Sequence, residues 1–135
     1  MTKSFARYLP ALALALVLPV AANAADTDAG VAKQAATASA HAGMALGAAD
    51  LKMAQVHLQH VVNCLVGPSG TGFDAKVGNP CKDQGQGAIA DAKGDAATEA
   101  RLTEALTEAR QGLQATTLES AHADAQKAMT ILQTK

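Results

Sequence analysis

The sequence has very few aromatic residues. Of its 135 residues none is Trp, one is Tyr and two are Phe. Phe5 and Tyr8 lie in the first 24 residues, so Phe73 is the only one of the three types that follows that segment. A core without aromatic side chains has to be filled by Ala, Leu, Val and Met, and Ala lets helices approach closely and has the highest helix propensity. The composition therefore favours a small all-α protein of closely spaced helices.

An excess of charge and a long apolar run are also missing. The chain has 11 Lys and Arg against 12 Asp and Glu, a formal net charge of −1. This balance offers no basic surface for nucleic acid or anionic membranes. The longest apolar run, residues 9–20, is well short of the ~20 apolar residues that a membrane-spanning helix needs. The sequence predicts a soluble protein that binds no nucleic acid and has no stable membrane insertion.

The apolar run is part of a predicted export signal. Lys3 and Arg7 precede it, and Ala22-Asn23-Ala24 follows it in the small-x-small pattern that signal peptidase cleaves. We therefore expect residues 1–24 to be a cleavable secretory signal peptide, with cleavage near Ala24. The mature protein is then periplasmic or secreted, and residues 25–135 suffice for one compact domain.

Sequence motifs of common enzyme classes are missing too. There is no nucleophile elbow, P-loop, dinucleotide fingerprint or HExxH zinc motif. The glycine-rich stretch 67–72 follows no predicted strand, so it does not indicate a phosphate-binding loop. We expect a protein without catalytic activity.

Only two cysteines occur, Cys64 and Cys81. In an exported protein such a pair favours a disulfide bond. Closing a loop of this size contributes about 3 kcal/mol of stability in the chain-entropy treatment. The spacing is neither the CxxC of a redox pair nor the CxxCH of covalent haem attachment.

Two blocks of helical sequence flank an irregular segment. Residues 28–66 and 95–134 have apolar residues at helical spacing, whereas the segment 67–94 contains seven of the 11 glycines together with Pro68 and Pro80. The predicted domain thus consists of a first helical block, a Gly-rich loop closed by the disulfide, and a second helical block.

The two blocks repeat one apolar pattern at an offset of 67 residues. In both copies the pattern crosses a predicted turn, followed by Asp50 in the first copy and by Thr117 in the second, and both are suitable N-caps. Each block is then a helical hairpin, and two hairpins form an antiparallel four-helix bundle. The alternative for residues 28–66 is a single long helix. The predicted helices span residues 28–46, 50–66, 95–113 and 117–134.

One face of the second predicted helix carries a candidate metal site. His57 and His60 are one turn apart, and Met53 lies a further turn away. All three are on a face separate from the core stripe of this helix, which consists of Leu51, Ala54, Leu58, Val62 and Leu65. Imidazoles at this spacing can share an ion, and a thioether adds affinity for copper. His41 of the first helix is expected at the same level, and Asp74 or Asp83 of the loop are candidate oxygen ligands. The predicted ion is copper or zinc. In the alternative reading, His57 and His60 hydrogen-bond to loop carbonyls and hold the loop.

His122 and Met129 form a second pair on one stripe of the last helix. A His and a Met on one stripe near the apolar centre of a helix are candidate axial ligands of a noncovalent haem, and in size, export and topology the chain resembles the cytochrome b562 type of periplasmic four-helix bundle. The chain departs from that family, which takes its axial Met from early in the first helix, whereas Met44 is near the end of that helix here.

A role in protein interaction is the remaining alternative. Met53, Val56, Val61 and Phe73 are candidates for an exposed patch that contacts a homodimer partner or another periplasmic protein. The high Ala and Gln content is also typical of a structural, stress-related periplasmic protein without a ligand.

Overall fold

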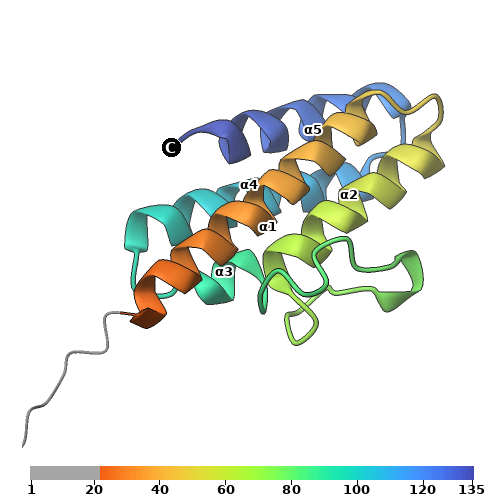
Figure 1. The fold of residues 1–135 in the computed structure, drawn as a ribbon. Coiled ribbons are helices and arrows are strands. Elements are labelled where there is room, and N and C mark those ends of the chain that lie inside the picture. The colour runs from red at the N-terminus through yellow and green to blue at the C-terminus, as the bar shows by residue number, and fades with distance from the viewer. Residues whose placement is uncertain (1–21) are drawn as a thin grey trace, which may run out of the picture.

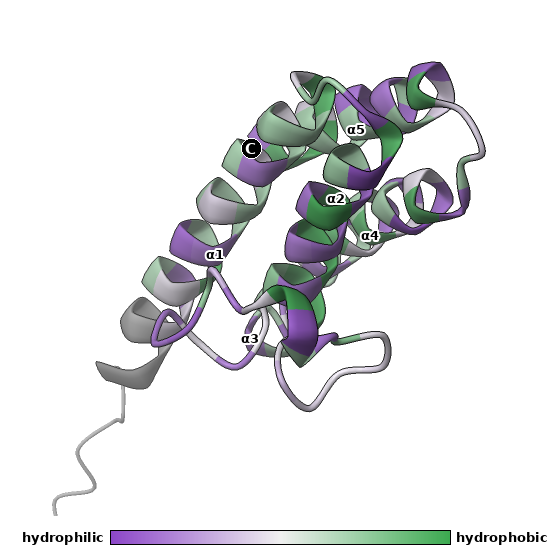
Figure 2. Cartoon of the chain, turned by 90° about the vertical axis from the view of Figure 1, so that its right-hand side faces the viewer, coloured by the Kyte–Doolittle hydropathy of each residue, from purple (hydrophilic) through white to green (hydrophobic). Residues whose placement is uncertain are grey.

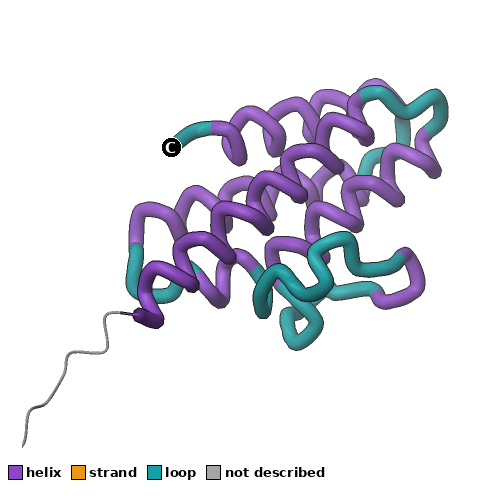
Figure 3. Tube along the Cα trace, in the orientation of Figure 1, coloured by secondary structure: helices purple, strands orange, loops and turns teal. Residues whose placement is uncertain are grey.

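The computed structural model describes residues 22–135, and within this range the chain is all-helical, with no β-strand (Figure 1). The predicted all-α class is confirmed. Four long helices dominate, and Figure 3 shows that the longest stretch of loop lies between the second and third α-helices. The elements are α1 (Ala22–Leu46), α2 (Leu51–Val66), the 3-10 helix η1 (Ala75–Val77), α3 (Ala88–Asp91), α4 (Ala96–Gln114) and α5 (Leu118–Gln133).

The ends of the long helices follow from their caps. The side chain of Asp50 accepts a hydrogen bond from the amide of Met53, and Thr117 does the same for Ser120. Both predicted N-caps are confirmed. A connection of four residues, 47–50, separates α1 from α2, so residues 28–66 form two helices and not one.

Two features differ from the sequence-based expectation by more than one residue. α1 already includes Ala22, the first described residue and six residues before the predicted start, because Ala-rich sequence gives no signal to stop a helix. The short helices η1 and α3 lie within the segment that was predicted to be loop only. Of the predicted signal peptide, residues 1–21 lie outside the described residues.

The long helices pack in a closed order. α1 lies against α2 and α5, and α4 lies against α5 and α2. Figure 2 shows hydrophobic and hydrophilic residues alternating along these helices, as expected where one face of each helix is buried. None of the helices in residues 22–135 combines the length and the apolar character required to traverse a bilayer.

Alanine forms much of the interior. Six alanines on α1 and α5 are fully buried, so these two helices approach each other through methyl groups. The second helix supplies larger side chains, with Leu58, Val62 and Leu65 at 0–1% exposure as the predicted core stripe requires. These six alanines of α1 and α5 are Ala38, Ala42, Ala45, Ala121, Ala125 and Ala128.

Two glycines, Gly67 and Gly87, allow the end of the loop near Gln86 to pass close to the C-terminus of α2. Gly67 has φ of 69° and Gly87 has φ of 118°, both in the region that favours glycine. A Cβ at Gly87 would lie 2.6 Å from the backbone of Val66, and one at Gly67 would overlap the backbone of Gln86. The chain therefore passes too close to the C-terminus of α2 for any side chain at these positions.

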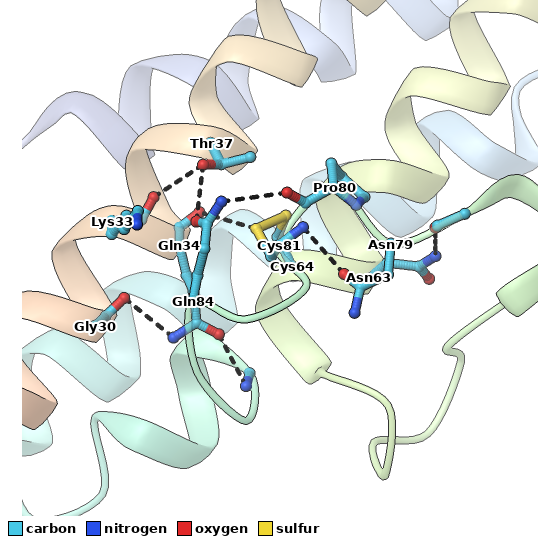
Figure 4. Close-up of a disulfide and its surroundings, with 12 residues drawn as sticks. Gly30, Lys33, Gln34, Thr37, Asn63, Cys64, Asn79, Pro80, Cys81 and Gln84 are labelled. Carbon is cyan, nitrogen blue, oxygen red and sulfur yellow. Dashed lines mark hydrogen bonds between the residues drawn. A yellow bond between two sulfur atoms is a disulfide. The ribbon is translucent and has the colours of Figure 1, made fainter.

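The predicted disulfide between Cys64 and Cys81 is present, with the two Cα atoms 5.2 Å apart. Cys64 is in the last turns of α2, so the bond ties the loop to this helix. Figure 4 shows that the loop is also held by α1, where Thr37 donates a hydrogen bond to the side-chain oxygen of Gln84 at 2.9 Å. The loop is thereby fixed against both α1 and α2.

Candidate metal centre

Three histidines from α1 and α2 converge at the seam between these helices. His57 and His60 are three residues apart on α2 and share a face, and His41 faces them from α1. The Asp50 cap and the short connection set the register that brings His41 to their level. All three side chains are partly buried. The predicted meeting of His41 with the two α2 histidines is confirmed.

The spacing of the rings fits a shared ion. One ring nitrogen of each histidine can be chosen so that all three atoms lie within 4.8 Å of one another. The Nδ1 atoms of His41 and His57 are 3.4 Å apart. Two nitrogens bound to one tetrahedral zinc ion at 2.0–2.1 Å are separated by about 3.3 Å. This pair therefore already has the separation of two ligands, and a ring nitrogen of His60 lies within 4.8 Å of both residues' ligand atoms.

His60 has a hydrogen-bonding pattern expected of a metal ligand. Its Nε2 lies 2.6 Å from the carbonyl oxygen of Val77. A carbonyl oxygen can only accept, so Nε2 must carry a proton. In the neutral ring the lone pair is then on Nδ1, which is buried and has no hydrogen-bond partner among the described residues. A ligating histidine commonly donates its other N–H to a backbone carbonyl in this way.

The electrostatics of the cluster favour neutral imidazoles. Burial, followed by the neighbouring His60 and His57, lowers the pKa of His41 from 6.5 to about 4. Burial and the neighbouring His60 also lower the pKa of His57. Both rings are consequently uncharged at neutral pH, the form in which imidazole binds a metal.

A buried asparagine holds the loop that orients His60. Asn63 is fully buried and donates to the carbonyl oxygens of Asp74 and Gly78, each at 2.8 Å. Its side-chain oxygen accepts from the amide of Asp74 at 2.9 Å and from Gln59 at 3.0 Å. The backbone on both sides of Val77 is therefore fixed to α2 by one side chain.

Gln34 performs a similar role at the other end of the loop. Its side chain is 1% exposed, donates to Asp91 at 2.8 Å and accepts from the amide of Gly87 at 2.9 Å. Neither Asn63 nor Gln34 was predicted from the sequence as a residue of the site. A polar residue inside an otherwise apolar helical face was the only available signal, and it did not indicate a partner.

Of the other predicted ligands, Met53 lies near the histidine cluster, whereas the loop carboxylates Asp74 and Asp83 are not part of it. Met53 lies one turn from His57 on α2, and 47% of its surface is exposed. Asp74 and Asp83, predicted as oxygen ligands, do not belong to the cluster. The carboxylate of Asp74 instead caps η1 by accepting from the amide of Lys76, and Asp83 is exposed on the loop.

The pair predicted for haem makes contacts within the protein. Nε2 of His122 lies 3.1 Å from the carbonyl oxygen of Ala48, at the connection between α1 and α2. Met129 is partly buried, and its sulfur would lie 3.5 Å from a Cβ at Gly43 of α1. Both side chains thus join α5 to α1 and its connection.

The predicted interaction patch needs a correction. Val61 is fully buried and belongs to the core, because it lies on the same side of α2 as Ala54 and Leu58. Val56 and Phe73 are partly buried, and of the four predicted residues only Met53 is exposed.

Comparison of the chain with models of protein families, with curated proteins and with solved structures finds no match. The geometry of the site is therefore the basis for assigning a function.

Proposed function

We propose that this is a small exported, non-catalytic protein that binds one copper or zinc ion through His41, His57 and His60. The observation that carries the proposal is the convergence of three ring nitrogens, one from each residue, within 4.8 Å. Three histidines from two helices make a protein-defined site, in contrast to an HxxH pair on one exposed helix face.

The donor set supports a transition metal. The cluster holds only imidazoles and no carboxylate. Imidazole suits zinc and copper, whereas magnesium and calcium prefer oxygen ligands. The lowered pKa of His41 and His57 reduces competition from protons at neutral pH.

The proposed scaffold is an antiparallel four-helix bundle made of the hairpins 28–66 and 95–134. Its support is the closed packing order of the four long helices and the short connections within each pair. In this arrangement the first hairpin carries the ligands and the second buries the apolar side of that hairpin. The disulfide-closed loop then covers one side of the ligand cluster.

Export of the protein is part of the proposal. It is supported by the signal-like residues 1–24 and by the disulfide, which persists in an oxidising compartment such as the periplasm. A protein of this kind would meet metal ions outside the cytoplasm.

Calorimetric titration of the metal-free protein with Zn(II) and Cu(II), and chelator competition with Cu(I), test the proposal. We expect one ion per chain, and at least a 100-fold weaker affinity in the double variant His57→Ala/His60→Ala. The matched control is His122→Ala, which removes the fourth histidine from outside the cluster. The proposal fails if wild type binds none of these ions, or if the double variant binds Zn(II) and Cu(II) as tightly as wild type.

A further inference from the structure

Two methionines, Met44 and Met53, are the exposed large apolar side chains of the described residues, at 51% and 47% exposure. The third methionine within residues 22–135, Met129, is partly buried and would contact a Cβ at Gly43. Met129 therefore fills space between helices, as methionine commonly does in cores. The exposed pair has no such packing role to explain it.

Both exposed methionines lie next to the histidine cluster. Met44 follows His41 by three residues on α1, and Met53 precedes His57 by four on α2. Residues at these spacings are neighbours on one helix face, one turn apart. Since the His41 and His57 rings meet across the seam, both methionines are placed along that seam, one turn closer to the connection 47–50.

The two side chains are on the outer side of the seam. At 100° per residue, Met44 is turned about 160° from the buried Ala42, and Met53 about 100° from the buried Ala54. Their exposure agrees with this placement. A pair of thioethers and a cluster of imidazoles thus occupy successive turns of the same two helices.

We propose that Met44 and Met53 are ligands of Cu(I), bound at the solvent-facing end of the cluster with one imidazole of His41 or His57 as the third donor. This inference rests on the proposed metal-binding function and specifies the ion and its oxidation state. Thioether sulfur is a soft, uncharged ligand that selects Cu(I), whereas zinc and Cu(II) are bound well by imidazole. An ion can reach exposed sulfurs without any separation of α1 from α2.

Anaerobic competition with a chromophoric Cu(I) chelator tests the inference. The variant is Met44→Leu/Met53→Leu, because leucine preserves volume and helix propensity and removes only the sulfurs. We expect at least a tenfold loss of Cu(I) affinity and no change in Zn(II) affinity. The matched control Met129→Leu removes the buried thioether and should change neither affinity.

X-ray absorption of the Cu(I)-loaded protein gives a second readout. Wild type should show sulfur scatterers around copper, and the Met44→Leu/Met53→Leu variant should show nitrogen alone or bind too weakly to load. Equal Cu(I) affinity in both proteins overturns this inference and leaves the histidine site intact. A variant that changes the oligomeric state in light scattering but keeps its Cu(I) affinity also overturns it, because the methionines then form a protein contact. If wild type binds no ion at all, the proposed function itself fails.

Discussion

Asn63→Ala tests whether the loop orients the metal ligand His60. The side chain of Asn63 makes three hydrogen bonds to the loop backbone, two to carbonyl oxygens at 2.8 Å and one from an amide at 2.9 Å. A typical intramolecular hydrogen bond contributes about 1 kcal/mol, so the substitution should lower the free energy of unfolding by about 3 kcal/mol. Urea unfolding followed by circular dichroism measures this loss.

The same substitution should weaken metal binding without touching a ligand. Val77, whose carbonyl oxygen accepts from His60 Nε2, lies between the two loop residues whose carbonyls Asn63 holds. Loss of an outer hydrogen bond to a ligating histidine typically lowers metal affinity 10–100-fold. We therefore expect a loss of at least about tenfold, measured by calorimetric titration at a temperature where the variant remains folded.

Asn79→Ala is the matched control. Asn79 is an asparagine within the loop itself. Its side-chain oxygen accepts one local hydrogen bond, from the amide of Cys81 at 3.0 Å. The expected cost is about 1 kcal/mol, with metal affinity unchanged. If Asn63→Ala reduces stability but binds the metal as tightly as wild type, the Val77 carbonyl does not orient His60, and the reasoning is refuted.

Three further perturbations address the loop, the helix packing and the protonation of the cluster. Cys64→Ser/Cys81→Ser should cost about 3 kcal/mol in urea unfolding and also weaken metal binding, because the bond closes the loop that carries Val77; unchanged metal affinity would separate the disulfide from the site. Gly112→Ala should lower the melting temperature relative to Gly43→Ala, since a Cβ at Gly112 would lie 2.6 Å from buried Leu58, whereas one at Gly43 would make an ordinary 3.5 Å contact. In the metal-free protein, the pKa of His41 is about 4 when folded and near 6.5 when unfolded, so the unfolded state takes up the proton first and stability should fall as the pH drops from 6.5 to 4. His41→Gln should flatten that part of the pH dependence in urea unfolding, and an unaltered slope would contradict the assignment.

Local signals made most of the fold predictable. Asp50 and Thr117 are polar residues placed just before apolar periodic sequence, and each caps a helix by a hydrogen bond that spans only three residues. The pairing of Cys64 with Cys81 required only that two cysteines be oxidised. In these cases the interaction is determined within a few residues or by elimination, so the sequence contains enough information.

Loop contacts were not predictable in the same way. Asn63 binds backbone 11 and 15 residues away, and Gln34 binds Asp91 at a separation of 57 residues. Such bonds exist only once the loop path is fixed, and that path depends on the close crossing at Gly67 and Gly87. Neither Asp74 nor Asp83 belongs to the histidine cluster. For Asp74 the cause is the loop path, because its backbone bonds to Asn63 of α2 while its carboxylate caps η1.

The sequence left two interpretations of the histidines open, as metal ligands or as residues that hold the loop, and His60 is compatible with both. His60 donates from Nε2 to the loop, and its Nδ1 is buried with no hydrogen-bond partner within residues 22–135. Leaving a buried polar atom unpaired costs on the order of 1–3 kcal/mol, so a purely structural histidine would gain stability from a partner at Nδ1. A bound ion at that atom would remove this cost, and the free energy of metal binding would then add directly to the stability of the loop. The ion and the disulfide accordingly stabilise the same loop. Loss of the disulfide or of the loop contacts should therefore lower metal affinity, and removal of the ion should lower the stability of the loop.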